Sequence, residues 1–188
     1  MRIMAFGHRK QVGKSTACKF LVSHLKLNTK GQRITSIGFA TALYDICYTL
    51  YGWAGFMDEN YYEGHPQEKE KILHILGKTP RQILIDVGTS VFREVYQGTW
   101  VDYLAHKTNY DYLAIKDMRF ENEFSTVKAV GGYCVRIDRP SIPHTDDIAD
   151  IGLAHLPDSA WDAVIVNNGS LNDLHANVIQ LSRRFLNI

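Results

Sequence analysis

One stretch decides how the rest of the chain is interpreted: Gly7-His8-Arg9-Lys10-Gln11-Val12-Gly13-Lys14-Ser15-Thr16. It follows a short apolar run, residues 3–6, and precedes a run in which apolar side chains recur at helical spacing. A strand, a glycine-bounded loop and a Gly-Lys-Ser triplet that opens a helix together indicate a phosphate-binding P-loop. The backbone N–H groups of such a loop form a nest for anions, and the helix N-terminus behind it adds further donors.

Two side chains of this stretch have distinct predicted roles. Lys14 is expected to reach the β- and γ-phosphates of a nucleotide, and Ser15 to offer its hydroxyl to Mg²⁺. The strict pattern places a glycine five residues before Gly13, where this chain has His8. Either the loop is one residue longer and starts at Gly7, or His8 takes a position that glycine usually occupies because of its free φ angle.

The composition limits the class of protein. The chain has 188 residues, about one domain, and its formal net charge of +1 argues against electrostatic binding of nucleic acid by the whole surface. Three widely spaced cysteines, Cys18, Cys47 and Cys134, are typical of reduced core thiols. We find no signal-peptide pattern and no membrane-length apolar run, and therefore expect a cytoplasmic protein without a nucleic-acid or membrane partner. The sequence leaves a homodimer open.

Alternating strand and helix patterns define the expected fold. Runs rich in β-branched and other apolar residues predict strands over residues 3–6, 34–39, 112–115, 133–137 and 163–166. Helical patterns lie between them, so we expect an α/β fold of the P-loop NTPase type, with a parallel five-stranded sheet flanked by helices.

A single domain with two excursions is expected. Between the second and third strands, helices are predicted over 41–51, 68–76, 79–93 and 99–105, and an irregular aromatic loop over 52–66. This insertion, about residues 41–108, is the expected substrate-binding part. A polar segment with three prolines, about residues 139–158, is interpreted as a lid.

Candidate functional residues follow the strands. Ligands of parallel α/β sheets bind at the carboxyl ends of the strands, which gathers the P-loop, Asp117, Arg119 and Arg139 at one edge. Asp117 could hold Mg²⁺ directly or through water; the alternative is a helix cap or a partner of Arg119. Arg81, Arg93, Arg119 and Arg139 suit phosphate because a guanidinium binds two oxygens at once; the alternative for each is a surface charge or an ion pair.

A set of short segments, spread over nearly the whole chain, shares its spacing with a known kinase family. They are the basic P-loop ending Gly13-Lys14-Ser15-Thr16, then Phe39-Ala40, Thr79-Pro80-Arg81-Gln82, Val87-Gly88-Thr89 with Arg93 and Trp100-Val101, Asp117-Met118-Arg119-Phe120-Glu121-Asn122-Glu123, Gly131-Gly132, residues 136–140 and residues 162–170. These segments resemble the deoxynucleoside monophosphate kinases of bacteriophages, within the P-loop nucleoside monophosphate kinase group.

The resemblance implies transfer of the γ-phosphoryl group of ATP·Mg²⁺ to a deoxynucleoside monophosphate, to give the diphosphate. The acceptor is an ionised phosphate oxygen, so no general base is needed. The resemblance implies that Arg81 and Arg93 hold the acceptor phosphate, and that Arg119 and the lid residue Arg139 neutralise charge in the transition state.

Three further residues receive substrate roles from the resemblance. Gly88 and Thr89 would let the backbone or a hydroxyl approach the nucleotide, and Trp100 would either stack on a base or fill the core. The chain also departs from the family. The usual Phe-Ala-Asp-Pro-Leu-Lys reads here as Phe39-Ala40-Thr41-Ala42-Leu43-Tyr44, so the polar contacts of that Asp and Lys with the nucleotide are in doubt.

Two other functions remain open at this stage. One is a small-molecule P-loop kinase with an alcohol acceptor, such as a nucleoside or dephospho-coenzyme A, which would need a carboxylate near the hydroxyl; Asp86 or Asp117 could serve. The other is a nucleotide-binding P-loop protein without phosphotransfer, which would be expected to carry a basic or partner-binding face.

Overall fold

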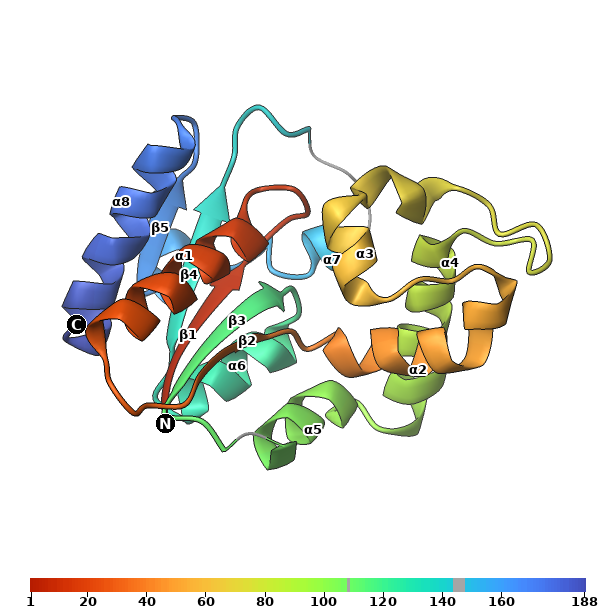
Figure 1. Cartoon of the computed structure of the whole chain (residues 1–188), viewed down its shortest axis with the longest axis horizontal. Helices are drawn as coiled ribbons and strands as arrows, with labels where there is room; N and C mark the ends of the chain where they lie inside the picture. Colours follow the sequence, from red (N-terminus) through yellow and green to blue (C-terminus); the bar gives the residue numbers. More distant parts are fainter. Residues whose placement is uncertain (108, 144–147) are drawn as a thin grey trace. The chain divides into compact units, whose positions relative to one another are not determined.

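Five parallel strands form one sheet, in the order β2-β3-β1-β4-β5 (Figure 1). The strands are β1 (Arg2–Gly7), β2 (Ile34–Ile37), β3 (Tyr112–Met118), β4 (Tyr133–Asp138) and β5 (Ala163–Val166). The structure is a computed structural model, and it describes residues 1–107, 109–143 and 148–188. The parallel sheet and its helical crossovers confirm the predicted α/β class.

The described chain divides into two units, the first of which holds the sheet. The first unit comprises Met1–Phe39 and Lys107–Ile188, and the second unit comprises Ala40–His106. Within the first unit β1 is central, with Arg2 in register with Tyr112 of β3 and Met4 in register with Tyr133 of β4. Residues 3–7 are all buried, which explains why the first strand reads as a continuous apolar run.

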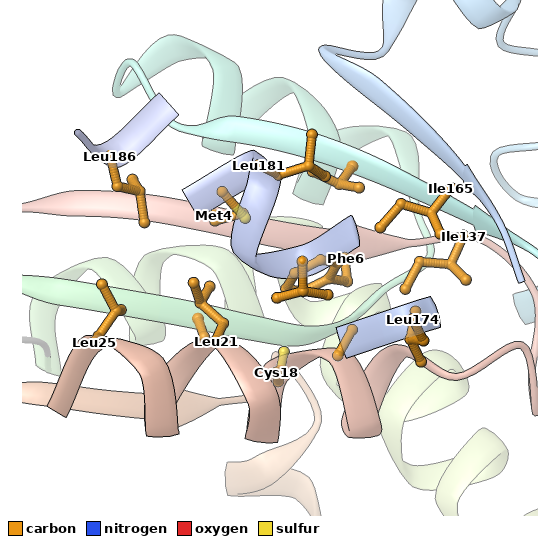
Figure 2. Packing of buried hydrophobic residues seen from close by; sticks show 14 of the residues in the cluster. Met4, Phe6, Cys18, Leu21, Leu25, Ile137, Ile165, Leu174, Leu181 and Leu186 are labelled. Atoms are coloured by element: carbon orange, nitrogen blue, oxygen red, sulfur yellow. The ribbon is translucent and has the colours of Figure 1, made fainter. Parts of the chain in front are cut away.

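Helices cover both faces of this sheet. On one face α1 (Lys14–Asn28) and α8 (Leu171–Leu181) pack side by side, and Figure 2 shows the buried side chains that they share with the strands. Among these are Leu21 and Leu25 of α1, Leu174 and Leu181 of α8, and Met4, Phe6, Ile137 and Ile165 of the strands. On the other face lies α6 (Glu121–Ala129), whose Phe124 ring contacts the Trp161 ring at 5.1 Å between centroids. α8 is followed by η5 (Ser182–Leu186).

The region interpreted as a lid holds two short elements, α7 (Ile148–Ile151) and η4 (Asp158–Ala160). Residues 144–147, which belong to the expected lid, lie outside the described residues. The lid therefore stays a prediction.

All the named elements of the second unit are helices or helical turns. Its elements are α2 (Thr41–Tyr51), η1 (Gly52–Ala54), α3 (Glu59–Gly64), η2 (Pro66–Glu70), α4 (Pro80–Ile85), η3 (Asp86–Arg93) and α5 (Thr99–Lys107), the last of which ends at the boundary with the first unit. The rings of Tyr44, Phe56 and Tyr62 lie within 6.5 Å of one another between centroids, and all three side chains are buried.

Two local predictions in this unit are wrong. The helix expected over 68–76 is a 3₁₀ turn that ends at Glu70, because the chain reverses at Gly77 (φ +64°) and the Leu73 N–H donates to the Lys78 carbonyl at 3.0 Å. The loop expected over 52–66 contains α3, since Asp58 caps that helix by accepting the Tyr61 N–H at 2.8 Å.

The cysteines agree with the expectation from composition. Cys18, Cys47 and Cys134 are free thiols with buried side chains, and burial raises the pKa of Cys134 to about 12 and that of Cys47 to about 11. Across the described part of the chain, no helix has the length and apolar character that a bilayer span requires.

Candidate functional site

The P-loop runs from the end of β1 to the start of α1. Its backbone angles distinguish between a longer loop that starts at Gly7 and a loop with His8 in the usual place of glycine. His8 has a φ of +95°, so it occupies the position where glycine is usual, and the loop has the standard length. Gln11 (φ +60°) and Gly13 (φ +110°) also have left-handed conformations. Three such residues in one short loop turn the chain sharply between strand and helix.

His8 is fixed from the side of β4. Its side chain is buried, and its Nδ1 lies 2.8 Å from Oδ1 of Asp138, the last residue of β4. Burial lowers the pKa of His8, the Arg136, Arg9 and Lys14 cations lower it further, and the Asp138 carboxylate opposes them. The neutral imidazole is therefore favoured in the folded protein.

Lys14 is folded back onto the loop. Its Nζ donates to the His8 carbonyl at 2.8 Å and to the Arg9 carbonyl, and the residue is 5% exposed. Burial lowers the pKa of Lys14 well below its ordinary value and the Arg119 guanidinium adds to this, while the Asp117 and Asp150 carboxylates oppose it. Ser15 and Thr16 follow, half-buried, in the first turn of α1. That turn contains no acidic residue, so an anion at this helix N-terminus meets no negative side chain from it.

Asn167 holds the loop from β5, and it was not among the predicted site residues. Its Nδ2 donates to the Val12 carbonyl at 2.9 Å, and a Cβ on Gly13 would lie 2.7 Å from the same nitrogen. A side chain at position 13 would thus displace the Asn167 amide and would also be strained by the φ angle. The available sequence signal was an amide side chain directly after a strand, at the edge where the P-loop lies.

Asp117 lies near the carboxyl end of β3 and supports the neighbouring strand connection. Its Oδ1 accepts the Phe39 N–H at 2.7 Å, and a Cβ on Gly38 would lie 2.6 Å from its Oδ2. The carboxylate is thus seated against the backbone that follows β2. This contact agrees with the structural alternative for Asp117, although a carboxylate has further lone pairs that a cation could use.

Arg119 follows β3 and is held at both ends. Its backbone N–H donates to Glu123 Oε2 at 2.7 Å, and its Nη1 lies 3.6 Å from Oδ1 of Asp150 in α7. Arg9 of the P-loop donates from Nη1 to the Ile142 carbonyl at 3.0 Å. Arg139 lies directly after β4 and is exposed. Of the predicted residues, the first unit therefore holds the P-loop, Asp117, Arg119 and Arg139.

The remaining predicted residues lie in the second unit. Arg81 is in α4 and donates from Nε to Glu70 Oε1 at 2.6 Å. Gly88, Thr89 and Arg93 lie in η3, a π-helix that continues α4. Arg93 is 8% exposed, so its guanidinium is largely shielded from solvent.

Trp100 braces this π-helix. Its Nε1 donates to the Gly88 carbonyl at 3.2 Å, its ring meets the Phe92 ring edge-on at 5.2 Å, and it is 5% exposed. The widened turns of a π-helix are frequent at functional positions. The burial of Trp100 favours the core-filling alternative over stacking on a base.

Thr41 and Tyr44, which stand where the family pattern has Asp and Lys, are hydrogen-bonded to charged residues elsewhere in the second unit. Thr41 Oγ1 donates to Glu59 Oε2 at 3.0 Å, and Lys69 Nζ donates to the Tyr44 hydroxyl at 2.6 Å. Lys69 Nζ also lies 5.1 Å from the centre of the Tyr44 ring. A carboxylate and an ammonium therefore contact the two positions where the family pattern has Asp and Lys.

The oxygen atoms of Ser15 and Asp117 are of the kind that binds Mg²⁺. The ion prefers hard oxygen ligands and usually keeps several waters, so one hydroxyl and one carboxylate suit it. Within residues 1–107, 109–143 and 148–188, no group of three or more His, Cys, Asp and Glu side chains is arranged to hold a metal by itself.

The model of the deoxynucleotide monophosphate kinase family matches residues 79–178. A mimivirus protein (Acanthamoeba polyphaga mimivirus), named "Putative deoxynucleotide monophosphate kinase", is 28% identical over 186 residues, which is 90% of each chain. The deoxynucleotide monophosphate kinase of Escherichia phage RB69 is 30% identical over 103 residues, 52% of this chain and 41% of that protein.

Among solved structures, shikimate kinase from Bacteroides thetaiotaomicron aligns over 100% of this chain and 99% of its own, with 14% identity and a TM-score of 0.49. That likeness is too weak to bear on function. The family match covers 100 residues of 188, from position 79 to position 178, and includes the capped helix of Arg81, the π-helix and Asp117. On this match, the chain belongs to the deoxynucleotide monophosphate kinase family.

Proposed function

We propose that this chain, a nucleotide kinase by its family, transfers the γ-phosphoryl group of ATP to a deoxynucleoside monophosphate. The products are ADP and the deoxynucleoside diphosphate. The observation that supports this most directly is the P-loop with Lys14 buried against its carbonyls. A P-loop binds the phosphates of a nucleoside triphosphate, and the family name gives the acceptor class.

On the donor side, the P-loop amides and Lys14 bind the β- and γ-phosphates. Lys14 exchanges its contacts with the His8 and Arg9 carbonyls for phosphate oxygens when the nucleotide binds. A phosphate also stabilises the ammonium, which compensates for the burial that lowers the pKa of Lys14 in the free protein.

Ser15 and Asp117 are the residues that would hold Mg²⁺ with the nucleotide. When bound, the ion neutralises negative charge on the β- and γ-phosphates. The hydroxyl of Ser15 lies in the first turn of α1, and the Asp117 carboxylate is oriented by the Phe39 N–H.

Transfer itself needs positioning and charge neutralisation. An oxygen of the acceptor phosphate forms a bond to the γ-phosphorus, and the bond from that phosphorus to the β–γ bridging oxygen breaks, so ADP leaves with the bonding electrons. The attacking oxygen is already ionised, so no proton has to be removed. Arg81 and Arg93 bind the acceptor phosphate, and Gly88 and Thr89 lie against the acceptor nucleotide. Arg119 and Arg139 stabilise the charge on the group in transfer.

The test is an assay of ADP release with Mg²⁺-ATP and each deoxynucleoside monophosphate in turn. The wild-type chain should phosphorylate at least one of them, and Lys14→Ala should lower kcat by at least about 100-fold, the loss typical for a single transition-state donor. Lys26→Ala, in the exposed last turn of the same helix, is the matched control and should keep the wild-type rate.

Two results would contradict the proposed function. One is wild-type turnover by Lys14→Ala, which would remove the P-loop from the reaction. The other is phosphorylation of a nucleoside or of dephospho-coenzyme A with no product from any monophosphate, because an alcohol acceptor defines a different kinase class.

A further inference from the structure

A buried carboxylate outside all the predicted site residues touches the P-loop. Asp150 of α7 is 3% exposed, and its Oδ1 accepts the Lys10 N–H at 2.7 Å. The same Oδ1 lies 3.6 Å from Arg119 Nη1, and Oδ2 lies 3.9 Å from Lys10 Nζ. One carboxylate therefore joins three segments of the first unit: the P-loop, the connection after β3, and α7.

The partners of Asp150 offset the free-energy cost of burying its carboxylate. A carboxylate removed from water is strongly destabilising unless it is paired and hydrogen-bonded. A backbone N–H and a guanidinium both meet this need, and a charge-assisted hydrogen bond to the loop backbone is stronger than a neutral one. The position of Asp150 is thus set by electrostatics, and in turn it restrains the groups that it binds.

Arg119 is the group most constrained by this arrangement. Glu123 Oε2 accepts the backbone N–H of Arg119 at 2.7 Å and that of Phe120 at 3.1 Å, which fixes the start of the side chain. Asp150 then fixes its guanidinium end. Both charges also act on Lys14: after burial, the Arg119 guanidinium lowers the pKa of Lys14 and the Asp150 carboxylate raises it.

We propose that Asp150 is a positioning residue for phosphoryl transfer, holding the Arg119 guanidinium beside the P-loop before ATP arrives. This inference rests on the proposed function, in which Arg119 stabilises the group in transfer. A cation that is already oriented needs no reorganisation during the reaction, and this preorganisation is a major source of rate enhancement.

The decisive variant is Asp150→Asn. The amide keeps an oxygen that can accept the Lys10 N–H, and it loses the charge that faces Arg119. We expect kcat to fall by about 10- to 100-fold, the scale of a misplaced catalytic group, while the KM values for ATP and for the monophosphate change little. Asp158→Asn is the matched control: Asp158 also pairs with an arginine, Arg136 at 2.7 Å, but its side chain is 74% exposed, and kcat should be unchanged.

A double-mutant cycle separates positioning from simple stabilisation. If Asp150 acts through Arg119, Asp150→Asn should cost nothing further in an Arg119→Gln background, because the group that it positions is gone. Thermal unfolding of each variant is measured alongside. Should Asp150→Asn not fold, the cycle is run with Asp150→Glu, whose longer side chain shifts the carboxylate and lowers kcat only where Arg119 is present.

Several outcomes overturn the inference. An unchanged kcat in Asp150→Asn does so, and so does a loss that simply adds to that of Arg119→Gln. Tighter ATP binding by Asp150→Asn would show that the carboxylate competes with phosphate for the P-loop, the opposite of a positioning role. In each of these cases the wild-type chain still turns over, so the proposed function stands. A wild-type chain without monophosphate kinase activity defeats the proposed function and this inference together.

Discussion

His8 has a left-handed backbone although it carries a bulky side chain. A non-glycine residue in a sparsely populated φ/ψ region costs about 1–3 kcal/mol, and it persists where the surroundings over-determine it. Here the surroundings are the Asp138 contact at 2.8 Å and the hydrogen bond from Lys14 to the His8 carbonyl. The strain therefore lies at the residue that shapes the start of the P-loop.

The strain can be measured by comparing two variants at this position. His8→Gly and His8→Ala both lose the imidazole, but only glycine accepts a φ of +95° without strain. After allowing for the greater chain entropy of glycine, we expect His8→Gly to be more stable than His8→Ala by about 1–2 kcal/mol in denaturant unfolding. Gln32 is an exposed loop residue without a positive φ, and there glycine should be no better than alanine. Equal stabilities at position 8 would mean that the loop carries no strain there.

The pH dependence of stability should carry a contribution from His8. The pKa of His8 is lowered in the folded protein from its ordinary 6.5, so below that pH the unfolded chain binds a proton more readily than the folded one. The contribution is complete above pH 6.5 and is lost as the pH falls through the lowered value. The difference in unfolding free energy between the wild type and His8→Gln should therefore shrink from pH 7.5 toward pH 5. A constant difference would place the imidazole in a solvated setting.

At the scale of the elements, the π-helix η3 depends on a side chain outside it. Trp100→Phe keeps an aromatic ring and removes the N–H that bonds to the Gly88 carbonyl. We expect a loss of about 1–3 kcal/mol, because a buried acceptor loses its donor. The KM for the monophosphate should rise while that for ATP does not, since Thr89 and Arg93 lie on the same π-helix.

Trp53→Phe is the matched control for that experiment. The Trp53 indole also donates to a carbonyl, that of Leu50 at 2.9 Å, but this residue is 72% exposed and water can replace the bond. Trp53→Phe should therefore keep both the stability and the Michaelis constants of the wild type. If the two variants behave alike, Trp100 does not brace the π-helix.

The sequence predicts best those elements whose boundaries are set by residues close together in the chain. Thr79, Pro80 and Gln82 indicate a helix start, and the structure has the full capping box, with the Gln82 N–H on Thr79 Oγ1 at 3.2 Å and the Thr79 N–H on Gln82 Oε1 at 2.9 Å. The same helix continues from Asp86 as a π-helix, and there its contacts are to residues distant in the chain: Trp100 bonds to the Gly88 carbonyl, and a Cβ on Gly88 would lie 2.6 Å from Leu43 of α2. No pattern within residues 86–93 carries that information.

The same distinction holds for the candidate site. The P-loop is a local motif, so Lys14 and Ser15 could be identified from neighbouring residues alone. Asn167 and Asp150 act on the loop from positions about 140–155 residues away in the chain, as the separations of their hydrogen bonds show. Asn167 is an amide after a strand, and Asp150 is an acid in a polar segment. Neither local context predicts a contact with the P-loop, which depends on the topology of the whole sheet.

At the scale of the whole molecule, the candidate donor and acceptor residues belong to different units. The P-loop is in the first unit, whereas Arg81 and Arg93 are in the second. We therefore expect Arg81→Ala and Arg93→Ala to raise the KM for the monophosphate by about tenfold to a hundredfold, the value of one charge-assisted bond, with little change in the KM for ATP.

Lys78→Ala provides the control for these arginine variants. Lys78 is an exposed cation of the same unit, paired with Asp86 at 2.6 Å, and its removal should change neither Michaelis constant. Arg93→Lys tests the geometry of the contact, because an ammonium keeps the charge without the planar fork. If the arginine variants weaken ATP binding and spare the monophosphate, the acceptor has been assigned to the wrong unit.

The bond from Asn167 to the Val12 carbonyl also bears on how the protein is made. A ribosome makes Val12 155 residues before Asn167, and β1 can pair with β3 and β4 only after those strands have been made. At roughly 5–20 residues per second, about 8–30 seconds separate the synthesis of Val12 from that of Asn167. A fragment that ends before Asn167 therefore has the P-loop sequence without the hydrogen bond from Asn167 to the Val12 carbonyl.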